Sequence, residues 1–238
     1  MIIKTFRTMG QYYIPSILKT NHKLAINPVQ IALRSWDFQN GAKLMEHSWI
    51  GNSLVGAFIH LIGENSEYYG KPCVWAGDYA DSYINKRSKP EEDAKNIYFF
   101  ARDVNNMLGD YSAYASNALV LANQKYKKIF GKDIFRKDTY KNFKGDDVEY
   151  LTCRGMVDEY KYIVNLTTKE YIEIPEDNPE EWQVHPLPLL LADGNERGGG
   201  DYYGINKGMV GKWKFNRIGA TNDVPVSFKK LEIMFEER

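Results

Sequence analysis

The hydrophobic pattern predicts a strand hairpin at the start of the chain and a helix after it. Residues 11–18 (QYYIPSIL) are rich in residues that favour strands, TNHK supplies a turn, and KLAINP returns. This order predicts a β-hairpin within the first 30 residues. In SWIGNSLVGAFIHLIG (48–63), apolar residues recur at every fourth position, which is typical of an amphipathic helix. Ser48 is placed to cap the start of that helix.

The middle of the chain predicts a strand, a pair of helices and an exposed segment. CVWAGDYAD (73–81) reads as a short strand that runs into an acidic turn. A capping-box pattern at Ser88 opens a helix whose apolar face extends to Leu108, and a second helical pattern follows. We therefore expect a helical hairpin over about 89–131. Residues 131–149 are charged and rich in turn formers, which predicts an exposed loop or a domain boundary.

Strand patterns dominate the second half of the chain. A second hairpin is predicted at 160–175, where an aromatic-rich strand, a polar turn and an alternating strand follow one another. Further strands are predicted in LTCRGMV, VHPLPLLLA, MVGKWKFNRIG and SFKKLEIMFEE. The order of elements indicates an α+β fold with a mixed or antiparallel sheet and a mostly β C-terminal half. We expect a single domain over residues 1–238.

Composition and charge narrow the class of protein. The chain of 238 residues is long enough to bury a core of its own, and 43% hydrophobic and 26% charged residues are typical of a globular protein. Lys plus Arg and Asp plus Glu number 31 each, so the net charge is zero. A balanced chain argues against nucleic acid or a membrane surface as its main partner, although it is compatible with a local basic patch. Two cysteines are too few for a disulfide scaffold. With no signal-peptide pattern and no long apolar run, the sequence predicts a cytoplasmic protein without a membrane partner.

The segment ADGNERGGGDYYG (192–204) is the first candidate for a ligand site. Its three consecutive glycines let backbone N–H groups approach a ligand closely and form a nest for an anion. Arg197 would complement a phosphate or a carboxylate, and Asp193 and Asp201 would bind a sugar hydroxyl, a base edge or a metal. The segment lacks the ligand spacing of an EF-hand, the ending of a P-loop and the context of a dinucleotide fingerprint. The alternative is a flexible surface loop between two strands.

A second candidate is VWAGDYAD (74–81), where acids follow a strand. Asp78 and Asp81 would act as paired carboxylates in acid–base chemistry, or would hold a divalent cation. Trp75 and Tyr79 offer flat surfaces for a base or a sugar. The alternative is a capped turn with solvated acids and a tryptophan in the core.

Two histidines are further candidates for catalysis. His47 follows Glu46 ahead of a predicted helix, but no second histidine completes a zinc-protease motif. His185 lies close in sequence to the glycine-rich segment. The sequence holds no nucleophile elbow, so a hydrolase would use Asp78 or Asp81 with one of these histidines.

Four separated blocks carry a resemblance to a family of uncharacterised phage and bacterial proteins. The blocks are MGQYY (9–13), NGAKLMEHSWIGN (40–52), VWAGDYAD (74–81) and HPLPLLLADGNERGGGDYYG (185–204). Members of that family typically start at MGQYY, which implies that Met9 is an alternative start to Met1. Asn216 stands where the family pattern has an acidic residue. The resemblance lends no catalytic residues, and its phage association implies a small accessory protein that counters host defence.

Three readings of function follow from these patterns. The leading reading is a protein that binds a small anionic or polar ligand, such as a nucleotide, and sequesters it. The second is a metal-assisted hydrolase that uses paired carboxylates and a histidine, so enzymatic activity stays open. The third is an interaction module that inhibits a host protein through tyrosine-rich loops. No cofactor and no metal ion is assigned. The predicted ligand-binding residues are Trp75, Asp78, Tyr79, Asp81, His185, Asp193, Asn195, Arg197, Gly199, Gly200 and Asp201.

Overall fold

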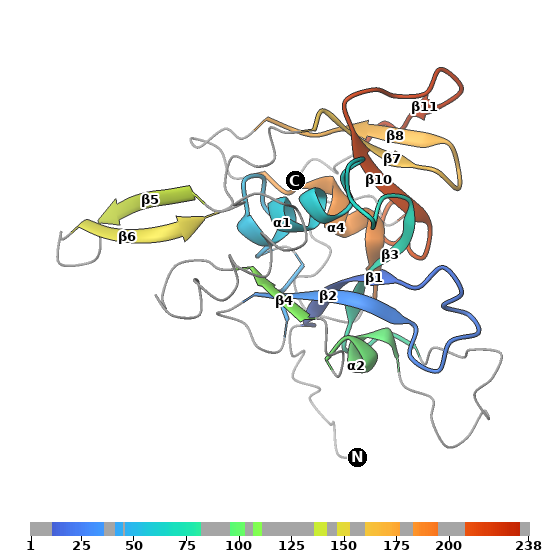
Figure 1. Cartoon of the computed structure of the whole chain (residues 1–238), viewed down its shortest axis with the longest axis horizontal. Helices are drawn as coiled ribbons and strands as arrows, with labels where there is room; N and C mark the ends of the chain where they lie inside the picture. Colours follow the sequence, from blue (N-terminus) through green and yellow to red (C-terminus); the bar gives the residue numbers. More distant parts are fainter. Residues whose placement is uncertain are drawn as a thin grey trace, which may run out of the picture.

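The structure is a computed structural model. Among the described residues, nine strands form one mixed sheet (Figure 1). The structure describes residues 11–35, 41–44, 46–81, 96–102, 107–110, 136–141, 147–152, 160–176, 183–194 and 208–233. The strands of the sheet are β1 (Tyr13–Leu18), β2 (Val29–Ser35), β3 (Lys71–Gly77), β4 (Met107–Asp110), β7 (Tyr162–Asn165), β8 (Glu170–Glu173), β9 (Ala192–Asp193), β10 (Arg217–Thr221) and β11 (Lys229–Lys230). Their order is β11-β8-β7-β10-β3-β1-β2-β4, and β9 pairs with β3 outside that order.

The sheet combines antiparallel and parallel pairs. β1 is antiparallel to β2 and to β3, β10 is antiparallel to β3 and to β7, and β7 is antiparallel to β8. The parallel pairs are β2 with β4, β3 with β9 and β8 with β11. The fold is therefore α+β with a mixed sheet, as the sequence pattern predicts.

Short helices cover both faces of the sheet. α1 (Ser53–Leu61) and α4 (Pro186–Leu191) lie on one face, and α2 (Ile97–Arg102) lies on the other (Figure 1). The larger buried cluster lies under α1 and α4. It includes Phe58 and Trp75, whose ring centroids lie 5.1 Å apart in an edge-to-face arrangement that aromatic pairs favour. A smaller cluster lies between α2 and the strands β1, β2 and β3.

Several strand ends meet at one end of the sheet. β2, β4, β3 and β9 all run opposite to β1, so all four finish at the end where β1 begins. Their last residues are Ser35, Asp110, Gly77 and Asp193, and the first residue of β1 is Tyr13. We call this the carboxyl end of the sheet, because four strands present their carboxyl termini there.

Both predicted hairpins are present, with one shift in position. β7 and β8 lie within the range predicted for the second hairpin. In the first hairpin, the segment KLAINP is not a strand. The chain turns over residues 20–24, the N–H of Lys19 donates to the carbonyl of Pro28 at 2.9 Å, and β2 begins only at Val29. The connection is thus longer than the four-residue turn that the sequence suggests.

The helix predicted at 48–63 is confirmed as α1, but its cap is a different residue. The side chain of Asn52 accepts hydrogen bonds from the N–H groups of Leu54 and Val55 at 2.9 and 3.4 Å. Asn52 therefore satisfies the first-turn donors, and the prediction that Ser48 is the cap is wrong. Asparagine is as good a cap as serine, and both residues precede the apolar pattern.

The predicted helical hairpin is partly replaced by a strand. α2 ends at Arg102, and β4 then pairs in parallel with β2, so the first helix does not extend to Leu108. Pairing with a neighbouring strand overrides the helical period here, as tertiary context often does. The second predicted helix lies outside the described residues.

The charged segment 131–149 contains strands of its own. β5 (Arg136–Lys141) and β6 (Asp147–Thr152) form a separate antiparallel pair, which Figure 1 shows apart from the main sheet. The strand predicted at LTCRGMV is present over its first two residues, which end β6, and its remaining residues lie outside the described range.

The strand predicted at VHPLPLLLA is a helix, α4. Pro186 and Pro188 are tolerated because the first turn of a helix holds N–H groups without intrahelical acceptors. MVGKWKFNRIG is mostly turn, since Gly211 and Phe215 take positive φ values of 69° and 65°, and β10 begins only at its end. SFKKLEIMFEE contributes just the two residues of β11 within the described range.

Candidate functional site

The parallel pairing of β3 and β9 brings Asp193, at the start of the glycine-rich segment, next to the end of the strand that leads into the acidic turn. Trp75 lies opposite Ala192, and Ala76 lies opposite Asp193. Asp78 and Gly194, the residues that follow the two strands, therefore both lie at the carboxyl end of the sheet. In open sheets, ligands commonly bind outside the carboxyl ends of parallel strands.

Gly77 is the point of closest packing at this end. A β-carbon at Gly77 would lie 2.4 Å from Gln11 Nε2, 2.7 Å from the carbonyl oxygen of Asp193 and 2.9 Å from Tyr13 Cε1. Three chain segments thus meet against a position that only glycine can occupy without displacing them. The Gln11 side chain is fully buried, accepts a hydrogen bond from the Tyr13 hydroxyl at 3.0 Å, and has an amide nitrogen with no partner among the described residues.

The carboxyl group of Asp78 fastens β1 to the end of β3. Its Oδ1 accepts the N–H of Tyr12 at 3.1 Å, and its own N–H donates to the carbonyl of Tyr12 at 2.9 Å. Burial raises the pKa of Asp78 above its ordinary value, and hydrogen bonds from the backbone of Tyr12, Asp78 and Tyr79 offset part of that shift. Asp78 is thus a half-buried residue, and one of its carboxylate oxygens accepts a hydrogen bond that holds the fold together.

Asn96 holds the rest of the acidic turn in place. Its amide nitrogen donates to the carbonyls of Asp78 and Ala80 at 3.0 and 3.2 Å, and its carbonyl accepts the N–H of Phe99 at the start of α2. Tyr79 keeps 38% of its surface exposed, and Asp81 is exposed beyond it. Of the predicted stacking residues, Tyr79 is the one that presents a ring to solvent.

Asp193 forms an ion pair beside the same turn. Lys214 Nζ lies 2.9 Å from Asp193 Oδ1, with 42% of the lysine side chain and 15% of the aspartate side chain exposed. The turn that carries Lys214 is fixed to the segment before β9, because Gly211 N–H donates to Leu189 and Trp213 N–H donates to Leu190. Lys214 therefore places a positive charge at the carboxyl end, beside the carboxylate of Asp193.

Trp75 does not offer a surface for stacking. The residue is fully buried against Phe58 in the core under α1, so the stacking role predicted for it is wrong. Its side chain points to the face of the sheet opposite α2, as strand alternation requires. The reading of this residue as a core tryptophan, the alternative given above, fits the structure.

His185 serves as the cap of α4 rather than as a base. Its Nδ1 accepts the N–H of Leu187 at 3.1 Å, so the ring proton of the neutral form resides on Nε2. The residue is fully buried, and burial lowers its pKa to about 3. A ring that is neutral and protonated on Nε2 cannot take a proton through that atom. The predicted catalytic role of His185 with Asp78 or Asp81 therefore has no support in this geometry.

His47 also has a local structural partner. Its Nδ1 accepts the N–H of Lys43 at 2.9 Å, in the turn that precedes α1. Burial lowers the pKa of His47, and the neighbouring carboxylate of Glu46 opposes that shift. This arrangement shapes the turn and assigns no catalytic role to the ring.

The structure joins all four sequence blocks through backbone contacts. Tyr13 exchanges two hydrogen bonds with Ala42, each 2.8 Å long, which ties the first block to the second. The N–H of His185 donates to the carbonyl of Ser48 at 2.7 Å, which ties the second block to the fourth, and β3 with β9 ties the third to the fourth. The described parts of the four blocks are thus in contact with one another.

Several predicted residues cannot be placed. Asn195, Arg197, Gly199, Gly200 and Asp201 lie outside the described residues. Asn216 lies away from the carboxyl end, in the turn before β10, where its carbonyl accepts the N–H of Cys73 at 2.9 Å. The substitution at this position is therefore next to the middle of β3.

Three residues at the carboxyl end escaped the sequence prediction: Gln11, Asn96 and Lys214. Gln11 is part of the MGQYY block, but no spacing rule singles out a lone glutamine. Asn96 precedes an apolar helical turn, and this capping signal could have located it. Lys214 is close to Asp193 only through the fold, so the sequence holds no signal for their ion pair.

No family model, no curated protein and no solved structure matches the chain. Within the described part of the chain, no group of three or more His, Cys, Asp and Glu side chains is arranged to hold a metal ion. In the same residues, no helix has the length and apolar character needed to cross a membrane.

Proposed function

We propose that the protein binds a small polar ligand of the nucleoside or nucleotide type at the carboxyl end of its sheet. The observation that carries the proposal is the parallel pairing of β3 and β9, which sets Asp78 and Asp193 at adjacent strand ends. Carboxylates at such a place suit the hydroxyls of a ribose and the N–H edge of a base. The ring of Tyr79 suits stacking.

The polar groups that lie near Gly77 support this ligand class. The amide nitrogen of Gln11 is a buried donor that still needs an acceptor. Lys214 adds a positive charge beside Asp193. Donors and acceptors are thus both present, as a ligand with hydroxyl and carbonyl groups requires. The anion-binding roles of Arg197 and the glycines stay predictions from the sequence.

We further propose that the bound ligand is sequestered rather than converted. Neither His47 nor His185 is arranged as a base for Asp78, which weakens the hydrolase reading. The resemblance to phage proteins supports a role in counter-defence, in which removal of a signalling nucleotide would protect the phage. An inhibitor of a host protein is the other reading that this association allows.

The test combines ligand release with thermal shifts. Small molecules freed from the purified protein by denaturation are identified by mass spectrometry, and a panel of nucleosides and nucleotides is screened for stabilisation. A ligand present at ~100 times its Kd adds about 2.7 kcal/mol, which raises the melting temperature by roughly 5–11 °C for a chain of this size. Recovery of the ligand intact after incubation supports sequestration, and recovery of products supports an enzyme.

Matched variants locate the binding. Asp78→Asn keeps an oxygen that can accept the Tyr12 N–H, and Asp193→Asn removes one charge at the second strand end. Both changes should abolish the ligand-induced shift. Asp223→Asn is the control, because Asp223 lies in an exposed turn after β10 and interacts through its backbone. If all three variants respond to ligand as the wild type does, the carboxyl end is not the binding site.

A further inference from the structure

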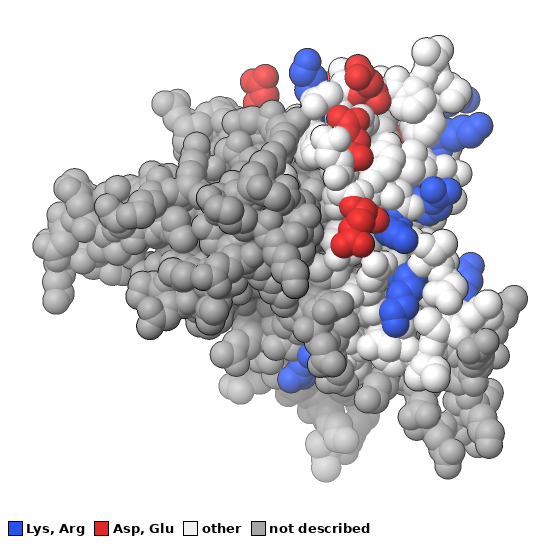
Figure 2. All heavy atoms as spheres, in the orientation of Figure 1, with Lys and Arg blue, Asp and Glu red and all other residues white. Residues whose placement is uncertain are grey.

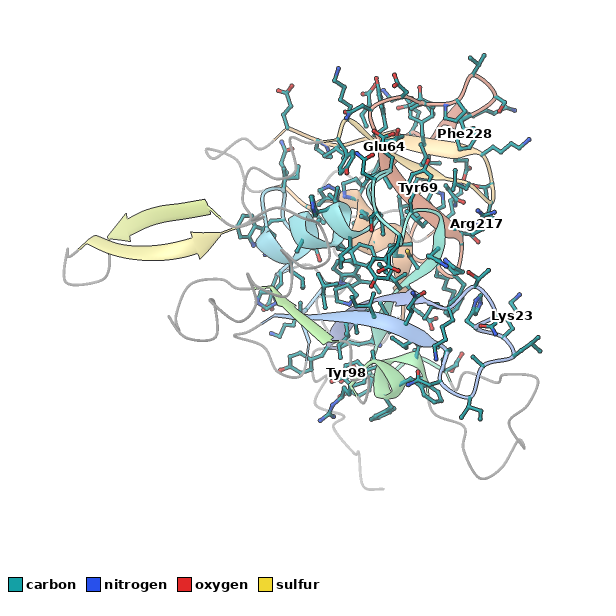
Figure 3. The ribbon with its side chains drawn as sticks, in the orientation of Figure 1. Lys23, Glu64, Tyr69, Tyr98, Arg217 and Phe228 are labelled. Atoms are coloured by element: carbon teal, nitrogen blue, oxygen red, sulfur yellow. The ribbon has the colours of Figure 1, made fainter. Side chains whose placement is uncertain are left out.

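Six cations lie on neighbouring segments of a part of the surface that the proposed ligand site does not use. They are Lys19, Lys23, Lys71, Lys169, Arg217 and Lys229, which we call the basic strip. Figure 2 shows Lys and Arg gathered along one side of the described surface, and Figure 3 shows Arg217 and Lys23 directed outward on that side. Lys71 begins β3, whereas Asp78 follows its end, so the strip and the acids of the carboxyl end lie at opposite ends of this strand.

Hydrogen bonds connect the segments that carry the strip. Arg217 donates its N–H to Thr167 Oγ1 at 3.0 Å and its Nε–H to the carbonyl of Gly70 at 2.9 Å. The neighbouring Lys71 Nζ donates to Thr20 Oγ1 at 3.2 Å, in the connection between β1 and β2. These contacts join the β7–β8 turn, the start of β10, the start of β3 and the β1–β2 connection.

Backbone pairing extends the strip to β11. The N–H of Lys229 donates to the carbonyl of Lys169 at 2.9 Å, and Lys229 lies opposite Glu170 in the parallel pair of β11 with β8. Lys169 itself has a φ of 58° in the β7–β8 turn, which presents it at the tip of the hairpin. The strip therefore runs from the start of β11 to the connection of β1 with β2.

No cation of the strip has an acid partner among the described residues, and neither does Lys161, whereas four other described cations do. Elsewhere Lys43 pairs with Glu46, Lys214 with Asp193 and Lys230 with Glu173. None of the six side chains of the strip forms an ion pair with a described residue.

Two of the acids that lie close to the strip in sequence interact with other groups. Glu170 accepts hydrogen bonds from Trp213 Nε1 at 2.9 Å and Thr168 Oγ1 at 2.8 Å, and it pairs with Lys212 at 3.1 Å. Glu67 bonds with the Tyr68 side chain. Lys212 offsets the charge of Glu170, and the cations of the strip, which have no ion pair with a described residue, can attract an anion from outside the molecule.

We propose that the basic strip binds the phosphodiester backbone of nucleic acid without reading its sequence. Lysine and arginine side chains together with threonine hydroxyls are the groups that contact phosphates in such complexes, and Thr20 and Thr167 lie within the strip. A row of charges along several segments fits a linear polyanion better than a compact anion. The zero net charge of the chain conceals this segregation of charge, which explains why composition argues against a nucleic-acid partner.

The test measures binding of a short DNA duplex of random sequence, and of the same strand alone, by fluorescence anisotropy between ~50 and ~200 mM salt. Non-specific binding with Kd in the range of ~1–100 µM is expected, with a steep loss of affinity as salt rises. Each phosphate contact contributes about −0.9 to the slope of log K against log salt on duplex DNA.

Charge-matched variants test the strip itself. Lys71→Gln with Arg217→Gln should reduce the salt slope by about 2 and weaken binding at every sequence tested. Lys43→Gln with Lys161→Gln removes the same charge from two exposed places outside the strip and should change neither quantity by more than a small amount. Lys23→Gln with Lys229→Gln repeats the first experiment with side chains that make no hydrogen bond in the fold, in case the first pair alters stability.

Three outcomes would overturn the proposal. They are no binding up to ~100 µM protein at the lowest salt, an equal salt slope in the strip and control variants, and binding to vesicles of anionic lipid with none to nucleic acid. The ligand-binding proposal uses other residues, so the Asp78 and Asp193 variants should bind nucleic acid as the wild type does. The two proposals can therefore fail separately.

Discussion

Replacement of His185 by asparagine should make the stability of the protein less sensitive to acid. The ring of His185 is fully buried, and burial lowers its pKa from 6.5 to about 3. Asparagine has a side-chain oxygen that can accept the Leu187 N–H, so it replaces the capping bond without a titrating group. The variant thus separates the capping role of the residue from its protonation.

The size and sign of the effect follow from proton linkage. The unfolded chain binds a proton at His185 below about pH 6.5, whereas the folded chain does so only below about pH 3. Burial of the neutral His185 ring therefore leaves the free energy of unfolding at its full value above pH 6.5. Below that pH the free energy of unfolding decreases progressively, until the pH reaches the pKa of the ring in the folded protein. At about pH 5 the loss amounts to about 2 kcal/mol, equivalent to roughly 4–8 °C in melting temperature.

The assay is urea or thermal unfolding of both proteins at a series of pH values between about 7 and 5. A cavity left by the smaller asparagine lowers stability by the same amount at each pH, so it cancels when the slopes are compared. His22 and His47 are present in both proteins and cancel as well. Parallel loss of stability in wild type and variant would refute the reasoning, because it would mean that His185 is protonated equally in the folded and unfolded states.

Four smaller changes test other parts of the structure, each by chemical denaturation. Gly77→Ala should cost about 1–3 kcal/mol, because the new β-carbon would lie 2.7 Å from the Asp193 carbonyl oxygen; a cost near zero would show that the three segments are not in contact there. Asn52→Ala should cost about 1 kcal/mol through loss of the α1 cap. Ser48→Ala should be neutral or stabilising, because the buried hydroxyl has no hydrogen-bond partner among the described residues; the reverse ranking of these two variants would restore Ser48 as the cap. Lys214→Ala should cost less than about 1 kcal/mol, with an effect that shrinks at high salt, since the lysine is exposed.

The sequence predicts those elements whose pattern is local and regular. β1 and the β7–β8 hairpin show the enrichment in strand formers that buried strands favour, and α1 shows apolar residues at a four-residue spacing. These signals lie within each segment itself, so they can be recognised without knowledge of its partners. The fold class follows from their order.

The sequence prediction fails for those elements whose conformation depends on contacts with distant parts of the chain. The run PLPLLL is apolar and short, so periodicity cannot separate a strand from the helix α4 that forms when His185 caps it. β4 holds four residues, and its pairing with β2 decides its conformation. β9 holds two residues and has no pattern of its own. Such elements are defined by their partners rather than by their sequence.

The candidate site was predictable only in part, because its residues are recognisable from local sequence but their proximity is not. Asp78 and Asp193 could be singled out because acids follow apolar segments, but their proximity depends on the β3–β9 pairing. The burial of Trp75 and the capping role of His185 could not be read from residue type, since both residues are common in ligand sites as well as in cores. The sequence identified the region of the candidate site, whereas the fold determines which side chains there are accessible to a ligand.

The β3–β9 pairing also determines when the candidate site can exist during folding. Trp75 and Ala192 are more than a hundred residues apart along the chain, and closing so long a loop costs entropy before any contact is gained. On the ribosome, β1 and β3 can pair long before β9 is synthesised. The acidic turn can therefore form before the strand beside it exists. Ligand binding at this place would therefore report that β9 has joined β3. A chain that ends before β9 would lack the site, even where its N-terminal hairpin is folded.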